Sequence, residues 1–222
     1  MGKILIIADE EEVRFAVQRG LQLAAKTGQD AEVVAFTYAP LGALHASSSE
    51  QAVVRKRLLA DREKSVKELI KQFKQPGQKV GHRVVWEKDI DTWVTRQCAA
   101  GAYIGVVKTG SGTGSLVHTS TDWQLLRKCS APVLLVAEKR WHRAKPVLVT
   151  LDLTTRSAGT KALNRNLLAT AVELSRALDV ELEIITAIEI PTLLSDLDLV
   201  DPIAYVKEAR ESMQPQIRKL AA

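Results

Sequence analysis

Short apolar runs rich in β-branched residues alternate along this chain with segments whose apolar residues recur at helical spacing. The first run, KILIIA, suits a strand buried on both faces, as strands of parallel sheets are. Because right-handed crossovers restrict how such units connect, the alternation predicts a doubly wound α/β fold with a five-stranded parallel sheet. The predicted strands are residues 3–8, 32–38, 81–87, 103–107 and 133–136, and the predicted helices are residues 12–26, 51–73, 89–100 and 122–129.

The longest predicted helix carries an apolar stripe with one charged member. Leu59 and Val66 mark this stripe, and Arg62 is the residue that does not fit it. Serines at 47–49 end a predicted loop over residues 40–50 and can cap the helix. The surplus of basic residues along the segment indicates a solvated helix surface, with an anion-binding face as the alternative. The tryptophans expected in the core are Trp86, Trp93 and Trp123.

The same pattern restarts after residue 145, which indicates an internal repeat. The run PVLVTL is followed by Asp152 just as KILIIA is followed by Asp9. A polar, basic connector separates the two copies. The predicted organisation is a first domain over residues 1–138, a connector over 139–145 and the N-terminal half of a second domain over 146–222.

The second copy contains only a β-α-β-α pattern. Its first helix can start at Ser157 or Thr160, a strand spans residues 181–188, and a second helix follows Asp201. Pro215 should kink or split that second helix, since proline lacks the amide hydrogen. Two strands do not complete a sheet, so one edge lacks its neighbour and invites pairing with another chain. The chain is then a fragment, a shortened gene product, or one covered by its first domain or by a second copy in a homodimer.

Composition narrows the class of protein further. The chain has 222 residues, 46% hydrophobic and 26% charged, which fits a soluble globular protein of one or two domains. The net charge of +5 arises from 31 basic and 26 interspersed acidic residues, which argues against a dedicated nucleic-acid surface. Neither a signal peptide nor a run of ~18 apolar residues occurs, so we expect a cytoplasmic protein without a membrane partner. The two cysteines, Cys98 and Cys129, are expected to be small buried apolar residues in a reducing compartment.

A glycine-rich stretch follows the fourth predicted strand and leads into a helix. Glycines allow the backbone to approach a ligand closely, and hydroxyl residues before a helix can cap it. Unpaired amide groups and the helix dipole attract phosphate at such a helix start. Residues 108–115 are therefore a candidate phosphate cradle. The residues concerned are Lys108, Thr109, Gly110, Gly112 and Gly114 in the loop and Thr119, Ser120 and Thr121 at the helix start.

The end of this stretch, TSTDWQLLRKCSAPVLLV, resembles the last part of a universal stress protein repeat, in particular the first repeat of tandem E-type members. VDPIAYVKEAR is similar to part of their second repeat, so the resemblance covers nearly the whole chain. It implies the adenine nucleotide alpha hydrolase-like fold, with strand order 3-2-1-4-5 and a partial second repeat of the same type. It also implies a role in the bacterial stress response.

In nucleotide-binding members of this family, an aspartate after the first strand contacts the adenosine part of ATP. Asp9 and Asp152 hold that position in the two copies, at the edge where α/β folds bind ligands, with a turn or capping role as the alternative. Thr37, at the end of the second strand, is a further candidate. The loop departs from the family's glycine pattern, because aligning the helix puts Val106 and Thr109 where glycines belong. This mismatch argues against tight ATP binding.

These observations favour a non-catalytic stress protein that acts as a ligand-binding or protein-interaction module and requires no cofactor. The alternative is an ATP- or AMP-binding switch with weak ATPase activity. An apolar ligand near residues 190–200 is a further hypothesis. The sequence offers no Ser-His-Asp set, paired carboxylates or metal-ligand spacing, so no catalytic residue and no metal site is assigned. The acidic run at residues 10–12 would repel phosphate, which argues against a hydrolase of the wider superfamily.

Overall fold

The computed structural model describes residues 2–8, 14–43, 47–110, 121–137, 145–155, 157–190 and 201–221. The chain divides into two compact units, Met1–Trp141 and His142–Ala222, and each is described by itself. Among the described helices, none is both long and apolar enough to cross a membrane.

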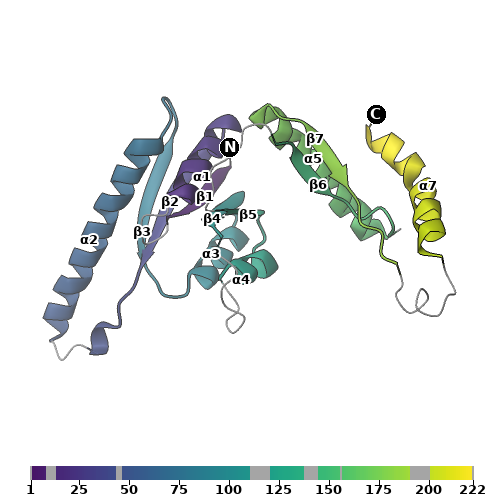
Figure 1. Cartoon of the computed structure of the whole chain (residues 1–222). Coiled ribbons are helices and arrows are strands. Elements are labelled where there is room, and N and C mark those ends of the chain that lie inside the picture. Colours follow the sequence, from purple (N-terminus) through teal and green to yellow (C-terminus); the bar gives the residue numbers. More distant parts are fainter. Residues whose placement is uncertain are drawn as a thin grey trace. The chain divides into compact units, whose positions relative to one another are not determined.

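The first unit is built on a five-stranded parallel sheet (Figure 1). Its strand order is β3-β2-β1-β4-β5, which confirms the predicted doubly wound fold. The chain moves outward from β1 to β3 and then crosses to β4 on the other side of β1, so the β1–β4 pair is the topological switch point. The strands are β1 (Lys3–Ala8), β2 (Asp30–Thr37), β3 (Val80–Trp86), β4 (Gly105–Thr109) and β5 (Val133–Val136).

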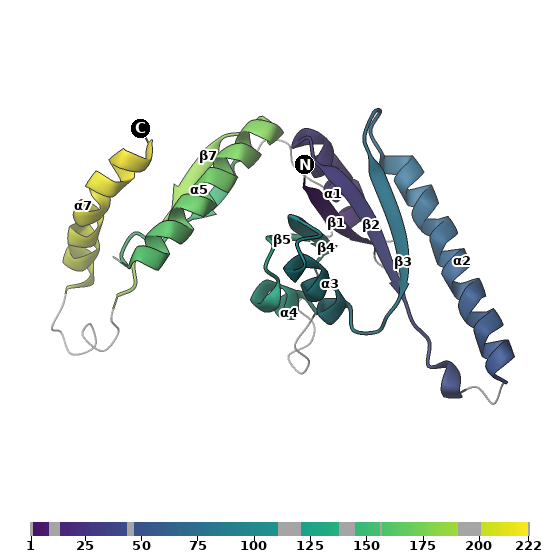
Figure 2. The same ribbon diagram turned by 180° about the vertical axis from the view of Figure 1, so that it is seen from behind.

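Helices cover both faces of this sheet, as Figures 1 and 2 show from opposite sides. Alternate residues of β1 point into two separate cores, one beneath α1 and α2 and the other beneath α3 and α4. Strands buried on both faces are the reason that β1 and β2 are apolar almost throughout. The helices are α1 (Phe15–Lys26), α2 (Ser48–Phe73), α3 (Ile90–Ala99) and α4 (Thr121–Lys128), with a short 3₁₀ turn, η1 (Leu41–Ala43).

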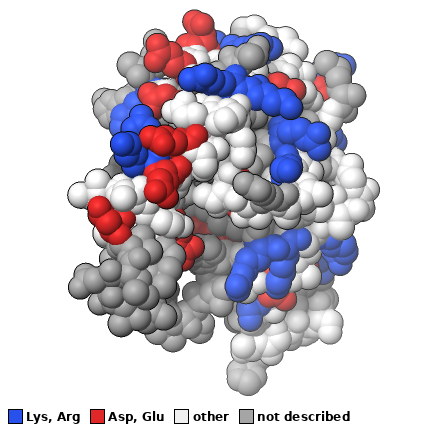
Figure 3. Space-filling view, turned by 90° about the vertical axis from the view of Figure 1, so that its right-hand side faces the viewer, with Lys and Arg blue, Asp and Glu red and all other residues white. Residues whose placement is uncertain are grey.

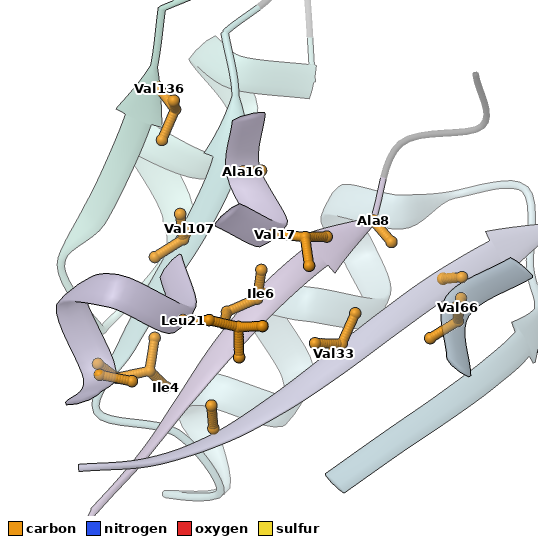
Figure 4. Close-up of a cluster of buried hydrophobic side chains, with 13 residues drawn as sticks. Ile4, Ile6, Ala8, Ala16, Val17, Leu21, Val33, Val66, Val107 and Val136 are labelled. Atoms are coloured by element: carbon orange, nitrogen blue, oxygen red, sulfur yellow. The ribbon is translucent and has the colours of Figure 1, made fainter. Parts of the chain in front are cut away.

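The first core brings α1 unusually close to β1 (Figure 4). Val17 and Leu21 of α1 lie against Ile6 of β1 in this cluster. A Cβ atom at Gly20 would lie only 2.7 Å from Ile6 Cγ1, so only glycine permits this approach. The close packing of α1 on β1 therefore explains why a glycine occurs within this helix.

Helix α2 begins earlier than the sequence pattern indicated, because its start is stabilised by a capping box. The Ser47 hydroxyl accepts a hydrogen bond from the Glu50 amide at 3.4 Å, and Glu50 Oε2 accepts one from the Ser47 amide at 2.8 Å. The prediction of a loop through residue 50 is therefore wrong at its end. Arg62, the charged member of the stripe, reaches over the end of β1 and donates from Nη2 to Ala8 O at 2.9 Å.

The second unit has the predicted β-α-β-α order and two parallel strands. One face of the pair packs against both helices through an apolar cluster that includes Val149 and Met213. Leu148 and Ile185 lie on the opposite face and are 55% and 45% exposed. The elements are β6 (Val147–Thr150), α5 (Ala158–Leu178), β7 (Leu182–Ile185) and α7 (Pro202–Ala221).

The starts of both helices in this unit agree with the sequence. The Ser157 hydroxyl accepts from the Thr160 amide at 3.0 Å at the start of α5, and Asp201 Oδ1 accepts from the Ile203 amide at 2.9 Å at the start of α7. The prediction that Pro215 splits α7 is wrong, because one helix runs through it. Pro215 is exposed, so water can satisfy the carbonyl group that loses its amide partner.

Candidate functional site

The candidate site of the first unit lies where the strands end at their carboxyl edge. Ala8 ends β1, Thr37 ends β2 and Thr109 ends β4, and these strands are neighbours in the sheet. The structure therefore brings Thr37, Lys108, Thr109 and Gly110 to one edge, at the switch point where α/β folds bind ligands. The predicted residues Asp9, Gly112, Gly114, Thr119 and Ser120 lie outside the described residues.

Strand β4 is longer at its carboxyl end than predicted, which corrects the assignment of two loop residues. Lys108 and Thr109 pair with β5 opposite Leu135 and Val136, so they belong to the sheet rather than to a loop. The Gly110 amide continues the pairing and donates to Val136 O at 2.9 Å. The first half of the predicted cradle is therefore fixed in position by the sheet.

Lys108 already has an internal counter-ion. Its Nζ atom lies 2.9 Å from Asp122 Oδ1, and the two side chains are only 10% and 8% exposed. The same ammonium donates to Thr109 O at 2.7 Å. Asp122 is in the first turn of α4, where the helix dipole stabilises a carboxylate. The pair thus joins the end of β4 to the start of α4. Asp122 balances the positive charge of Lys108, which was expected to attract an anion.

Two hydroxyl residues flank this ion pair. Thr109 is buried, and within the described ranges its Oγ1 has no hydrogen-bond partner. A buried polar atom left unpaired costs about 1–3 kcal/mol, so a ligand donor or acceptor there would be favoured. Thr121, the other hydroxyl residue, is half-buried as the first residue of α4.

A group of aromatic and cationic side chains lies farther along the same edge. Tyr38 directly follows β2 and is about half exposed, and its ring centroid lies 5.8 Å from that of Trp86 at the end of β3. Arg55 Cζ lies 5.2 Å from the Trp86 ring centroid, within the range of a cation–π contact. This group was not among the site residues predicted from the sequence. The signal was the i, i+7 spacing of Arg55 and Arg62, which places both on one stripe of α2.

Asp152, the counterpart of Asp9 in the second unit, takes part in a local turn. Its Oδ1 atom accepts from the amide of Thr154 at 3.0 Å, the hydroxyl of Thr154 at 2.7 Å and the amide of Thr155 at 3.1 Å. Hydrogen bonds from Thr155 and Thr154 lower the pKa of Asp152 to about 2. Asn164 also binds the backbone of Asp152, so the geometry favours the turn role over a free ligand group.

Other predicted features have mixed outcomes. Trp93 is buried in the core and Trp86 is half-buried, but Trp123 is 62% exposed, so the prediction that it lies in the core is wrong. In α4 it is Leu125 that is buried against the sheet.

Residues 191–200, where an apolar ligand was expected, lie outside the described residues. In the part of the chain that the structure describes, no group of three or more His, Cys, Asp or Glu side chains could hold a metal.

One face of the molecule shows how its charged side chains are distributed (Figure 3). On the face shown in Figure 3, Lys and Arg side chains lie interspersed with Asp and Glu side chains. Such a surface differs from the single-sign patch that nucleic-acid binding requires.

The sequence is similar to curated stress proteins over most of its length. Universal stress protein E of Salmonella typhi is 25% identical over 203 residues, covering 89% of this chain, and the protein of the same name from Escherichia coli strain K12 gives the same values. The chain is thus similar to E-type universal stress proteins along most of its length. A homologue of the E-type protein from Haemophilus influenzae is 22% identical over 185 residues, covering 79% of this chain and 60% of that protein. This chain spans 64% of the length of the Salmonella and Escherichia proteins, and no family model matches it.

Solved structures support the universal stress protein fold. A protein of unknown function from Pseudomonas aeruginosa PAO1 superposes with a TM-score of 0.60 at 18% identity, covering 97% of this chain and 69% of that one. A second, from Pseudomonas aeruginosa UCBPP-PA14 and provisionally named a universal stress protein, gives a TM-score of 0.59 at 18% identity, covering 97% and 70%. At this identity the likeness concerns the fold alone.

Proposed function

We propose that this universal stress protein acts in the stress response as a non-catalytic ligand-binding or protein-interaction module whose nucleotide site is degenerate. The observation that carries the proposal is the buried ion pair between Lys108 and Asp122, with 2.9 Å between Nζ and Oδ1. Lys108 is the cation at the end of β4 that would otherwise neutralise a phosphate. Its charge is already balanced within the protein.

A phosphate group would have to compete with Asp122 for Lys108 or bind without that cation. Displacing the carboxylate takes away its buried counter-ion, and breaking such a pair costs about 3–5 kcal/mol. That penalty reduces affinity by roughly two to four orders of magnitude. Asp122 also carries negative charge in the first turn of α4, where the helix dipole would otherwise attract an anion.

An ATP- or AMP-binding switch with weak ATPase activity is the second candidate. It is favoured by Thr109 Oγ1, which is buried at the end of β4 and has no hydrogen-bond partner among the described residues. It is also favoured by the contacts of Tyr38 and Arg55 with Trp86, because an aromatic surface beside a guanidinium suits a base with an attached phosphate. Both features lie on the sheet edge that carries Lys108.

Isothermal titration calorimetry of the full chain with ATP and AMP separates the two candidates. We expect no saturable binding tighter than a Kd of about 1 mM. Asp122→Asn, which keeps the side-chain shape but removes the competing charge, should bind ATP more tightly than the wild type. Micromolar binding by the wild type, weakened by Thr109→Val and accompanied by phosphate release, would overturn the proposal and favour the switch.

As a protein partner, we propose a second copy of this chain bound through the second unit. Leu148 and Ile185 are exposed apolar residues on the open face of the β6–β7 pair, where Glu183 lies opposite Leu148 and Thr150 opposite Ile185. Neither strand has another strand neighbour among the described residues. A second copy presents the same face, so one two-fold contact would cover both surfaces.

Sedimentation velocity tests this dimer. Leu148→Glu places a charge on the open face and should shift the chain to monomer. Leu163→Glu is a matched control, because Leu163 is equally exposed, at 57%, but lies on helix α5. A wild-type chain that stays monomeric at all concentrations, or a dimer that Leu148→Glu leaves intact, would contradict the proposal.

A further inference from the structure

The fold brings the two cysteines of the chain together. Cys98 lies near the end of α3 and Cys129 directly follows α4, and both helices cover the same face of the sheet. Cys98 is buried in the second apolar core, and Cys129 is half-buried against that core. The two thiols thus lie in the same apolar core, and the interaction with Cys129 contributes to the raised pKa of Cys98. Both are free in this structure.

Backbone hydrogen bonds fix the main chain at each cysteine. The Cys98 carbonyl accepts from the Gly101 amide at 2.9 Å, and the Cys129 amide donates to Leu125 O at 2.9 Å. Lys128, beside Cys129, also lies 4.0 Å from Asp91 in the first turn of α3. The contact between the thiols is therefore part of the packing of α3 on α4.

We propose that Cys98 and Cys129 form a modification site, at which a peroxide oxidises the two thiols to an intramolecular disulfide that ties α3 to α4. This proposal is independent of the proposed nucleotide and partner functions. It assigns a chemical role to a cysteine pair that the sequence analysis treated as small apolar residues.

The reaction proceeds in two balanced steps. The Cys129 sulfur, the more accessible one, attacks a peroxide oxygen; the S–O bond forms, the O–O bond breaks, and the released oxygen leaves as water with the thiol proton. The Cys98 sulfur then attacks the resulting sulfenic acid, forming the S–S bond and releasing the hydroxyl as a second water with the Cys98 proton. Two electrons pass from the two sulfurs to the peroxide.

The order of the steps follows from burial. Desolvation, helped by the contact with Cys129, raises the pKa of Cys98 to about 12, so Cys98 is a poor initial nucleophile. It is positioned instead to react with a neighbour that has already been oxidised. The second step should therefore be slow, and the oxidised state should form over minutes rather than at once.

Peptide mapping of the folded full chain tests the proposal directly. The reduced chain is treated with hydrogen peroxide, alkylated without reductant, digested and analysed by mass spectrometry. We expect a peptide pair linked through Cys98 and Cys129, a monomeric chain lighter by two hydrogen atoms, and recovery of both thiols with dithiothreitol. The thermal unfolding midpoint should rise on oxidation, since the cross-link restricts the unfolded chain.

Two variants identify which sulfur reacts first. Cys98→Ser should leave Cys129 as a sulfenic acid that dimedone traps, whereas Cys129→Ser should show little sulfenic acid at position 98. Cys98→Ala replaces the serine variant if the hydroxyl disturbs the apolar core, as judged by circular dichroism. Two thiols that both stay open to alkylation after prolonged peroxide treatment, or disulfides found only between chains, would overturn the proposal.

Discussion

Lys108 at the end of β4 and Asp122 in the first turn of α4 form an ion pair of 2.9 Å inside the first unit. The pair links the switch point of the sheet to the helix that would face a ligand. It supplies, from within the chain, the negative charge that a phosphate would otherwise bring. The proposed degeneracy of the nucleotide site depends on this relationship.

The ion pair should contribute to stability as a coupled unit. Lys108→Met or Asp122→Leu alone should lower the free energy of unfolding by about 3–5 kcal/mol, because each leaves a buried charge without its partner. The double variant should lose clearly less than the sum of the two single losses. Urea unfolding of the wild type and the three variants measures this coupling.

The Lys128–Asp91 pair is the matched control for that cycle. Its atoms are 4.0 Å apart and its side chains are 56% and 22% exposed, so its coupling should be at most about 1 kcal/mol. Additive losses at Lys108 and Asp122, or equal coupling in the two pairs, would mean that burial does not strengthen the first pair.

Glu32 should make the protein sensitive to acid. Burial alone raises the pKa of this carboxyl, but hydrogen bonds from Lys3 at 3.1 Å and Tyr103 at 3.0 Å, with the charge of Arg83, outweigh burial and lower it. A carboxyl with a lowered pKa stabilises the fold above its unfolded pKa, and that stability is lost as the pH falls through the folded pKa. Glu32→Gln should therefore lower the free energy of unfolding at pH 7 by about 1.5–3 kcal/mol. It should also make that free energy fall less steeply as the pH is lowered.

Urea unfolding across a pH series measures the effect of Glu32. Glu68→Gln, on the exposed surface of α2, serves as control and should leave the loss of stability at low pH unchanged. If Glu32→Gln loses stability at low pH as steeply as the wild type does, other carboxyl groups are responsible for the acid sensitivity.

Gly20→Ala should destabilise the protein although alanine is the better helix former. The propensity gain is about 1 kcal/mol, while forcing a methyl group into a packed core costs about 1–3 kcal/mol. The new Cβ would lie 2.7 Å from Ile6 Cγ1, and Ile6 is completely buried in the first core. Thermal unfolding should show a lower midpoint. Gly159→Ala, whose Cβ would lie 4.0 Å from its nearest neighbour, should show no such loss.

Asp152 should titrate far below an ordinary aspartate. Because Thr155 and Thr154 donate hydrogen bonds to the charged form, its pKa is about 2. Side-chain carboxyl chemical shifts recorded by NMR down to low pH measure this value directly. Thr154→Ala should bring the pKa back toward the usual range, while a wild-type value close to that of a free aspartate would contradict the turn.

The sequence predicted the fold well because its signal is local. Runs such as KILIIA are apolar only where a strand is buried on both faces, and the β1 and β2 runs lie where the pattern placed them. Helix starts were also predictable where a single side chain caps the helix, as at Ser157. These features depend on neighbouring residues alone.

The site was harder to predict because its decisive contacts join distant residues. Lys108 and Thr109 look like loop residues, yet pairing with β5 and the charge of Asp122 make their burial possible. The cysteine contact and the Arg55–Trp86 contact likewise exist only after the helices pack. Trp123 was misplaced because a short helix buries one narrow stripe, and Leu125 occupies it.

Native mass spectrometry of the purified full chain tests the central claim most directly, since it reports retained ligand and oligomeric state together. A degenerate nucleotide site predicts a chain that carries no nucleotide, even after incubation with ATP and brief desalting. Bound ATP or AMP at one per chain would contradict it.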